Sequence, residues 1–329
     1  MPRRVLVTGG AGFIGSHVVD HLLKAGDSVV AFDNFDPYYA VDQKRRNVAW
    51  ALAQPAYELI EADVRDRAAV DDAMRRCRPD AIVHLAAKAG VRASVEHPSE
   101  YLQVNEQGGL NVLEAARAQG NVPVAYASTS SVYGATKVVP FREDDPAMGP
   151  LSPYAASKRG AELMVHALHH LHAQPICVLR FFTVYGPRGR PDMAVHTFTR
   201  KLLAGESIRL HGEKTERDFT YVDDIARGVL GALAWASEGP RLGTFNLGCS
   251  EPVRVRRLIE IMAAALGVEA KVELGELGAS ESPVTAANVE KAHAAFGYAP
   301  RVSLPEGIDH WVKWCRESNE APQELKGPK

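Results

Sequence analysis

The chain has 329 residues, of which 46% are hydrophobic and 24% charged, which is enough for one large domain with a smaller lobe. Thirty-eight basic against forty acidic residues give a net charge of -2, which argues against nucleic acid or an anionic membrane as partner. The chain contains neither a signal-peptide pattern nor an apolar stretch long enough to span a bilayer, and its four cysteines are scattered without metal-ligand spacing. We therefore expect a cytoplasmic protein with reduced thiols and no metal.

Short β-branched runs alternate with helical patterns in the first half of the chain. The expected strands occupy residues 4–9, 28–33, 57–63, 81–87, 123–129 and 175–182. Amphipathic segments such as 14–26 and 101–120 lie between them and are expected to be helices. This alternation predicts an α/β fold with a parallel sheet covered by helices on both faces.

The alternation of strand and helix patterns ends after Phe182, where loops rich in Gly, Pro and Arg precede further helical segments and short strands. We interpret this part as a smaller C-terminal lobe, interleaved with the sheet through residues 217–225 and 243–248. The expected division is a sheet domain of residues 1–182, also receiving segments near 218–248, and a lobe formed mainly by 183–329. The last eight or so residues are polar and expected to be frayed.

A glycine-rich turn, "TGGAGFIG", follows the first expected strand and opens a helix. Gly9, Gly12 and Gly15 are spaced at intervals of three residues. Glycines at such a turn allow a pyrophosphate to approach the backbone closely, and a helix N-terminus offers it unpaired N–H groups and a favourable dipole. The motif in this context predicts dinucleotide binding.

Acidic residues end the next two expected strands. Asp33, eighteen residues after Gly15, can accept hydrogen bonds from a ribose 2′-hydroxyl and would repel a 2′-phosphate, so NAD is favoured over NADP. Asp63 could reach the adenine or could equally cap a helix. Residues 44–46, which are Lys, Arg and Arg, are interpreted as a solvated helix face.

The G-x-x-G-x-x-G spacing, with the motifs below, resembles the extended branch of the short-chain dehydrogenase/reductase superfamily. The resemblance implies a Rossmann-type doubly wound sheet with a smaller substrate lobe, which makes residues 1–182 the NAD-binding domain and 183–329 mainly the nucleotide-sugar-binding lobe. The residues expected to bind NAD are Gly9, Gly12, Phe13, Ile14, Gly15, Asp33, Asn34, Asp63, Val64, Leu85, Ala86, Ala87, Lys88, Tyr154 and Lys158.

Two reactive side chains lie one helical turn apart in "SPYAASKRGAEL". A helix capped by Ser152, with Pro153 in its first turn, places Tyr154 and Lys158 on one face. A free tyrosine has a pKa of about 10, and a nearby ammonium, helped by a positive nicotinamide ring, would lower this pKa and favour the phenolate. We therefore expect Tyr154 to be the catalytic base and Lys158 to tune it.

Hydroxyl groups end the fifth expected strand in "YASTSSVYG". The carboxyl end of a central parallel strand faces the ligand crevice. The family resemblance assigns Thr129 to the substrate hydroxyl that is oxidised. Thr129, Tyr154 and Lys158 together predict a nucleotide-dependent oxidoreductase-type centre.

The two residues after Thr129 help to distinguish branches of the family. Nucleotide-sugar 4,6-dehydratases resemble "TDEVYG" here and UDP-glucuronate decarboxylases resemble "TSEVYG", whereas this chain has Ser130 and Ser131. The resemblance implies that the reaction begins with removal of hydride from C4 of a nucleotide sugar, which gives a 4-keto intermediate. Without a carboxylate at these two positions, the intermediate can take the hydride back on its other face. The expected reaction is therefore 4-epimerisation of a nucleotide sugar.

Residues 88–98 and 180–194 resemble the corresponding segments of UDP-glucuronate 4-epimerases. Thr183 stands where UDP-glucose 4-epimerases commonly have Asn. We expect Ser130, Ser131 and Thr183 to supply neutral donors, and Arg190 to supply charge, around a sugar C5 carboxylate. A neutral UDP-hexose would also tolerate these residues, so UDP-glucose 4-epimerase remains an alternative, as do the decarboxylase and a non-catalytic NAD-sensing module.

The remaining expectations concern charged side chains and assembly. The resemblance places Arg217 on the UDP pyrophosphate, a contact that suits a bidentate guanidinium. Arg92 is a phosphate or sugar candidate or a surface ion-pair partner, and Asp223 and Asp224 are expected to cap a helix. The resemblance also implies a homodimer formed by the helices at 100–119 and 152–172.

Overall fold

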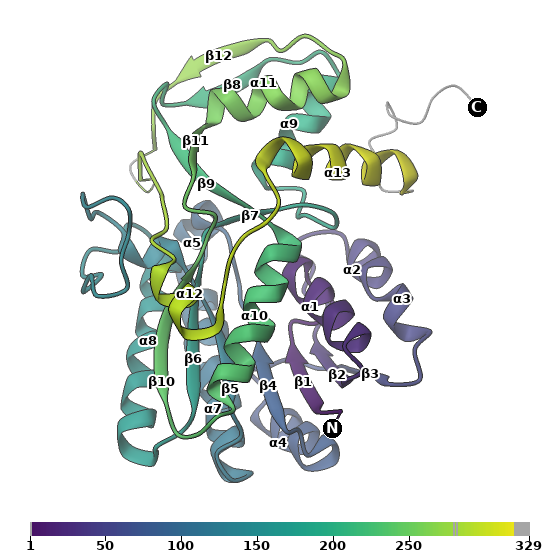
Figure 1. The fold of residues 1–329 in the computed structure, drawn as a ribbon, viewed down its shortest axis with the longest axis vertical. Coiled ribbons are helices and arrows are strands. Elements are labelled where there is room, and N and C mark those ends of the chain that lie inside the picture. The colour runs from purple at the N-terminus through teal and green to yellow at the C-terminus, as the bar shows by residue number, and fades with distance from the viewer. Residues whose placement is uncertain (1, 279, 281, 319–329) are drawn as a thin grey trace.

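The computed structural model describes residues 2–278, 280 and 282–318. Its main layer is a parallel sheet of seven strands in the order β10-β6-β5-β4-β1-β2-β3 (Figure 1). The expected strands are found as β1 (Arg4–Thr8), β2 (Ser28–Asp33), β3 (Tyr57–Glu61), β4 (Ala81–His84), β5 (Val124–Thr129) and β6 (Ile176–Phe181). The seventh strand, β10 (Leu242–Leu247), pairs with β6 at the edge of the sheet. The doubly wound Rossmann-type prediction is confirmed.

Helices cover both faces of the sheet because its strands are apolar on both sides. On one face lie α1 (Phe13–Lys24), α10 (Val222–Ala236) and α12 (Glu290–Phe296), and on the other lie α4 (Arg67–Cys77), α7 (Gly109–Ala118) and α8 (Pro153–His172). Short helices α2 (Val41–Asn47) and α3 (Ala49–Leu52) connect β2 to β3. Residues 217–225 and 243–248 were expected to interleave with the sheet. Helix α10 and strand β10 do so, whereas 217–221 belong to a separate small sheet.

The C-terminal lobe has its own apolar core, with Trp311 and Met262 among its fully buried side chains. A three-stranded sheet is formed by β7 (Thr183–Tyr185), β9 (Glu216–Tyr221) and β11 (Pro252–Arg254), and β8 (Ile208–His211) pairs with β12 (Val272–Gly275). Helices α9 (Ala194–Leu203), α11 (Val255–Leu266) and α13 (Leu304–Glu317) complete the lobe at the top of Figure 1. The polar C-terminal segment expected to fray lies outside the described residues.

The segment 101–120 differs from the single α-helix that its pattern predicted. After the short helices α5 (Val91–Glu96) and α6 (Pro98–Tyr101), residues Leu102–Gly108 form a π-helical stretch that leads into α7. Asn105 on this stretch accepts from Lys88 N at 2.8 Å and donates to Ser157 Oγ at 2.9 Å. These bonds join three distant segments, so the hydrophobic period alone could not predict the widened turn.

The expected capping by Asp223 and Asp224 is wrong. Tyr221 stands at the N-cap of α10 and makes no side-chain cap. Buried Asp224 accepts from the backbone N–H groups of Arg301 and Val302, at 2.9 and 3.1 Å, and thereby joins α10 to the segment before α13. Within the described ranges, none of the helices combines the length and apolar character that crossing a membrane requires.

Candidate active site

A cavity of about 920 Å³ lies at the carboxyl ends of the central strands and extends to the C-terminal lobe. Strand β1 lies between β2 and β4, so the strand order reverses here, which is the usual ligand position in such sheets. Every residue predicted for the site lines this cavity: Gly9, Gly12, Phe13, Ile14, Gly15, Asp33, Asn34, Asp63, Val64, Leu85, Ala86, Ala87, Lys88, Arg92, Thr129, Ser130, Ser131, Tyr154, Lys158, Thr183, Arg190 and Arg217.

The glycine turn leaves no room for side chains. Gly9 has a φ of +71°, and a Cβ there would lie 2.7 Å from the backbone nitrogen of Ala86. A Cβ on Gly15 would lie 2.0 Å from the carbonyl oxygen of Gly9. Helix α1 begins directly after Gly12, at whose position no side chain caps the helix. The turn is thus a cradle of backbone at a helix N-terminus, which fits the pyrophosphate of a dinucleotide.

Asp33 is held at the end of β2 by two backbone groups. Its oxygens accept from Ala11 N at 3.0 Å and from Phe35 N at 2.8 Å, and the residue is 6% exposed. Each carboxylate oxygen can accept a further bond. The orientation therefore suits a ribose hydroxyl, as NAD requires.

The structure decides between the two alternatives left open for Asp63 and corrects the expectation for Lys44. Asp63 is not a helix cap, because Asp66 caps α4; instead Asp63 accepts from Asn34 at 2.8 Å and from Arg65, whose hydrogen bonds lower the pKa of Asp63 to about 2. Lys44 is not on a solvated face. It is buried, lines the cavity, and its ammonium lies 5.0 Å from the ring centroid of Tyr39.

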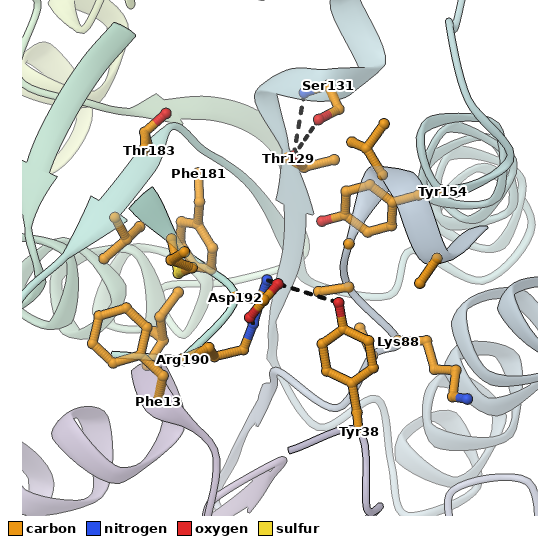
Figure 2. A pocket seen from close by; sticks show the side chains of 18 of the residues that line it. Phe13, Tyr38, Lys88, Thr129, Ser131, Tyr154, Phe181, Thr183, Arg190 and Asp192 are labelled. Carbon is orange, nitrogen blue, oxygen red and sulfur yellow. Dashed lines mark hydrogen bonds and ion pairs between the residues drawn. The ribbon is translucent and has the colours of Figure 1, made fainter. Parts of the chain in front are cut away.

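The three predicted catalytic residues meet at the ends of β5 and α8. Ser152 caps α8 as expected, accepting from Ala155 N at 3.2 Å, and this sets Tyr154 and Lys158 on one face of the helix. Thr129 Oγ1 accepts from Ser131 N at 3.2 Å, and its hydroxyl lies close enough to that of Tyr154 to lower the pKa of Tyr154. Figure 2 shows the phenol oxygen of Tyr154 pointing into the centre of the cavity.

The electrostatics of Tyr154 differ from the sequence-based expectation. Burial raises the pKa of Tyr154, while the nearby hydroxyl of Thr129 and the positive charge of Arg190 lower it. A buried phenol therefore starts above its ordinary pKa, and Arg190 is a nearby cation that was not expected to act on Tyr154.

Burial lowers the pKa of Lys158 to about 8, and the negative charge of Glu162 one helical turn further on opposes this shift. Glu162 is itself buried against Arg180, with two contacts of 3.0 and 2.8 Å, and accepts from Ser128 at 2.6 Å. This network joins α8 to β5 and β6 behind the catalytic face. The network keeps the Glu162 carboxylate near Lys158 but outside the cavity.

The lowered pKa of Lys158 predicts a pH-dependent stability. The folded-state pKa of about 8 lies below the ordinary value of 10.5, so the unfolded chain binds more protons between these pH values and stability rises with pH there. Relative to a Lys158→Met variant, the wild type should gain up to about 3 kcal/mol from pH 7 to 10.5. Urea unfolding of both proteins across this range measures the difference, and parallel curves would contradict it.

The three predicted substrate-binding arginines lie in different parts of the cavity. Arg190 reaches the catalytic end of the cavity and is paired with Asp192, at 2.9 and 3.0 Å. Arg217 bonds the carbonyl oxygens of Glu216 and Pro283, at 2.9 and 3.3 Å, which holds it on the wall formed by β9. Arg92 is exposed at the cavity rim.

The charge of Lys88 is directed away from the catalytic end of the cavity. Its side chain forms ion pairs with Glu100 and, at 3.9 Å, with Asp36, and Figure 2 shows it directed away from Tyr154. His84 is a structural histidine beside the cavity. It is buried, it bonds Thr8 at 2.8 Å, and burial lowers its pKa to about 3.

Sequence reasoning missed Tyr38 and Asp192, which meet in the cavity at 3.1 Å. A signal for Asp192 was present, because a carboxylate two residues after Arg190 in "GRPDMA" is close enough to pair with it. Tyr38 gave no comparable signal, since its partner lies 154 residues away. In the described part of the chain, no group of His, Cys, Asp or Glu side chains could hold a metal ion.

Residues 5–248 match the model of the NAD dependent epimerase/dehydratase family. The chain belongs to this family. As in the family as a whole, its cofactor is NAD, and the glycine cradle and Asp33 fit that cofactor.

Curated proteins and solved structures are similar to this chain over most of its length. A UDP-glucuronate 4-epimerase 1 of Arabidopsis thaliana is 41% identical over 94% of this chain and 76% of its own length. A UDP-glucuronate 4-epimerase of Thermodesulfobacterium geofontis is 39% identical over 98% of both chains. Among solved structures, the UDP-glucuronic acid 4-epimerase of Bacillus cereus in complex with UDP-glucuronic acid and NAD matches with a TM-score of 0.87 and 32% identity, over 94% of this chain and 98% of that one.

Proposed function

We infer that the chain is an NAD-dependent 4-epimerase that interconverts UDP-glucuronate and UDP-galacturonate through a transient 4-keto sugar. One observation carries the inference: a single cavity joins Thr129, Tyr154 and Lys158 to the guanidinium of Arg190, with serines at the two positions after Thr129. The relatives at 39–41% identity carry the same activity in their names. NAD would be held by residues 1–182 with segments near 218–248, and the nucleotide sugar mainly by 183–329.

The residues of the cavity can be assigned to successive parts of the reaction. Thr129 and Tyr154 would hold the 4-hydroxyl, and Tyr154 as phenolate would take its proton and later return it to the 4-keto oxygen. The charges of Lys158 and Arg190 would stabilise that phenolate. NAD, when bound, supplies the acceptor that takes the hydride from C4 and returns it to the opposite face.

The neutral residues after Thr129 explain why the intermediate would survive. The 4-keto form of a glucuronate is a β-keto acid, which loses CO2 readily when its carboxylate is protonated or desolvated. Ser130, Ser131 and Thr183 offer neutral hydrogen-bonding groups, and Arg190 offers a permanent positive charge. Together they would hold the carboxylate ionised while the sugar turns over.

Product analysis tests the proposal directly. Purified protein is incubated separately with UDP-glucuronate, UDP-glucose and UDP-xylose, and the nucleotide sugars are separated by chromatography. We expect UDP-galacturonate from the first substrate as the main conversion. CO2 with a UDP-pentose would instead identify a decarboxylase, faster conversion of UDP-glucose a hexose epimerase, and no conversion of any sugar a non-catalytic NAD-binding protein.

Replacing Arg190 by Ala should lower activity on UDP-glucuronate more than activity on UDP-glucose. Hydrogen bonds to charged groups contribute about 1.5–3 kcal/mol, so kcat/KM for UDP-glucuronate should fall about 10- to 100-fold beyond any fall for UDP-glucose. Steady-state kinetics on both substrates gives the two ratios. Equal losses on both would remove the case for an acid substrate.

We also propose a homodimer built on α8 and the segment 100–119. Leu102, Leu163, Met164 and Leu171 expose 43–68% of their surface on these neighbouring helices, where a second copy would cover them. Sedimentation measures the oligomeric state, and we expect a dimer for wild type and a monomer for Leu163→Glu. A wild-type monomer at micromolar concentration would contradict the proposal.

The four free cysteines agree with the proposed cytoplasmic location.

A further inference from the structure

The guanidinium of Arg190 is fixed in the cavity by Asp192. Nε donates to Oδ1 at 2.9 Å and Nη2 donates to Oδ2 at 3.0 Å, a two-point pairing along one edge of the guanidinium plane. Both side chains line the cavity near Tyr154 (Figure 2). Because charge-assisted pairs of this kind are directional, Asp192 determines which way Arg190 points.

Asp192 is itself held by Tyr38, which lies in the segment after β2. The Tyr38 hydroxyl donates to Asp192 Oδ2 at 3.1 Å, and the Arg190 guanidinium carbon lies 5.8 Å from the Tyr38 ring centroid. Burial opposes ionisation of Asp192, but the bonds and charge of Arg190 and the Tyr38 bond hold the pKa of Asp192 below its usual value. Asp192 is therefore a fixed carboxylate and not a free base.

The pairing leaves a second edge of the guanidinium for another carboxylate. Arginine has five N–H donors in a planar fork, and Asp192 uses Nε and one hydrogen of Nη2. Nη1 and the second Nη2 hydrogen form the other edge, which has the geometry of a bidentate carboxylate contact. Arg190 and Tyr154 line the same cavity, and Figure 2 shows both side chains at its centre, so the guanidinium lies at the reacting end.

We propose that Asp192, fixed by Tyr38, is a positioning residue that orients Arg190 toward the sugar and thereby sets the preference for a substrate bearing a carboxylate. The proposal rests on the proposed function, since it assigns to Asp192 a part in recognising the uronic acid. Asp192 touches Arg190 and acts through it. If Asp192 instead competed with the substrate carboxylate for Arg190, its removal would lower KM, so the sign of the change in KM distinguishes the two roles.

The test measures kcat and KM for UDP-glucuronate, with UDP-glucose and UDP as competing ligands, on the purified holoenzyme. For Asp192→Asn we expect KM for UDP-glucuronate to rise about 10-fold, equivalent to about 1.4 kcal/mol, with a smaller change in kcat. Inhibition constants for UDP-glucose and UDP should stay within about twofold, which is under about 0.5 kcal/mol. A structural defect would weaken all three ligands alike.

A second variant guards against loss of folding in the first. Tyr38→Phe removes the hydroxyl that holds Asp192 and should raise KM for UDP-glucuronate about threefold, in the same direction. Asp71→Asn is the control, because both carboxylate oxygens of Asp71 accept from Nε of Arg67 at 2.9 Å on α4, outside the cavity. The control should leave every constant unchanged.

A double-mutant cycle shows whether Asp192 acts through Arg190. In an Arg190→Ala background, Asp192→Asn should have no further effect on KM for UDP-glucuronate. An additive loss would show that Asp192 acts independently and would overturn the proposal.

The remaining outcomes separate this inference from the proposed function. If wild type epimerises UDP-glucuronate but Asp192→Asn lowers KM, leaves it unchanged or weakens all three ligands equally, the positioning role is wrong and the epimerase remains. If wild type converts UDP-glucose and not UDP-glucuronate, the proposed function fails and this inference fails with it.

Discussion

Replacing Tyr154 by Phe is expected to reduce kcat about 10²- to 10⁴-fold, the usual contribution of a positioned acid or base. The phenol oxygen lies at the centre of the cavity, close to the hydroxyl of Thr129, and feels the charge of Arg190. The Tyr154→Phe variant would leave the 4-hydroxyl without its proposed proton acceptor. Because the ring and the helix are retained, the NAD content should be unchanged.

The measurement combines an epimerisation rate with NAD released on denaturation of the purified protein. Tyr57→Phe is a suitable control, since the Tyr57 hydroxyl is buried without a partner and lies outside the cavity. The control should keep wild-type activity. More than about a tenth of wild-type kcat in Tyr154→Phe, a loss of under about 1.4 kcal/mol, would refute the assignment of the base.

Replacing Gly15 by Ala is expected to abolish stable binding of NAD. The added Cβ would lie 2.0 Å from the carbonyl oxygen of Gly9 and 2.8 Å from its carbonyl carbon, so the turn before α1 would have to move. This backbone forms the cradle for the pyrophosphate, and any movement displaces the N–H groups that would bind it. We expect at least about a 100-fold loss of NAD affinity, equivalent to about 2.7 kcal/mol.

Calorimetric titration of the NAD-free protein with NAD measures the loss of NAD affinity. Gly149→Ala provides the control, because its Cβ would meet Ala135 at an ordinary 3.5 Å and Gly149 does not line the cavity. The control should bind NAD like wild type. Wild-type affinity in Gly15→Ala would show that the cradle tolerates a side chain and does not bind the pyrophosphate as proposed.

The elements around the cofactor could be predicted from sequence because their signals are local. Alternating apolar runs marked the six strands β1 to β6, and "TGGAGFIG" marked the turn and the start of α1 within one residue. Ser152 and Pro153 marked the start of α8, which in turn placed Tyr154 and Lys158 on one face. Each of these inferences depends on residues that lie within a few positions of one another in the sequence.

The charges around the site could not be predicted, because they depend on contacts between distant segments. Lys44 was expected in solvent, yet α2 turns it inward toward Asp33 and Tyr39. Asp224 was expected to cap α10, yet it binds backbone near residue 301. The pKa of Tyr154 was expected to fall because Lys158 is close in sequence, whereas burial raises it and Arg190, from another segment, opposes the rise.

The fate of the C4 hydrogen tests transient oxidation at C4 most directly. UDP-glucuronate carrying deuterium at C4 is incubated with the enzyme in ordinary water, and the UDP-galacturonate formed is examined by NMR and mass spectrometry. If one hydride leaves C4 and returns to the same carbon from the opposite face, the product keeps its deuterium at C4. Product that has exchanged this deuterium for solvent hydrogen would show inversion by proton loss, and the catalytic assignment made here would be wrong.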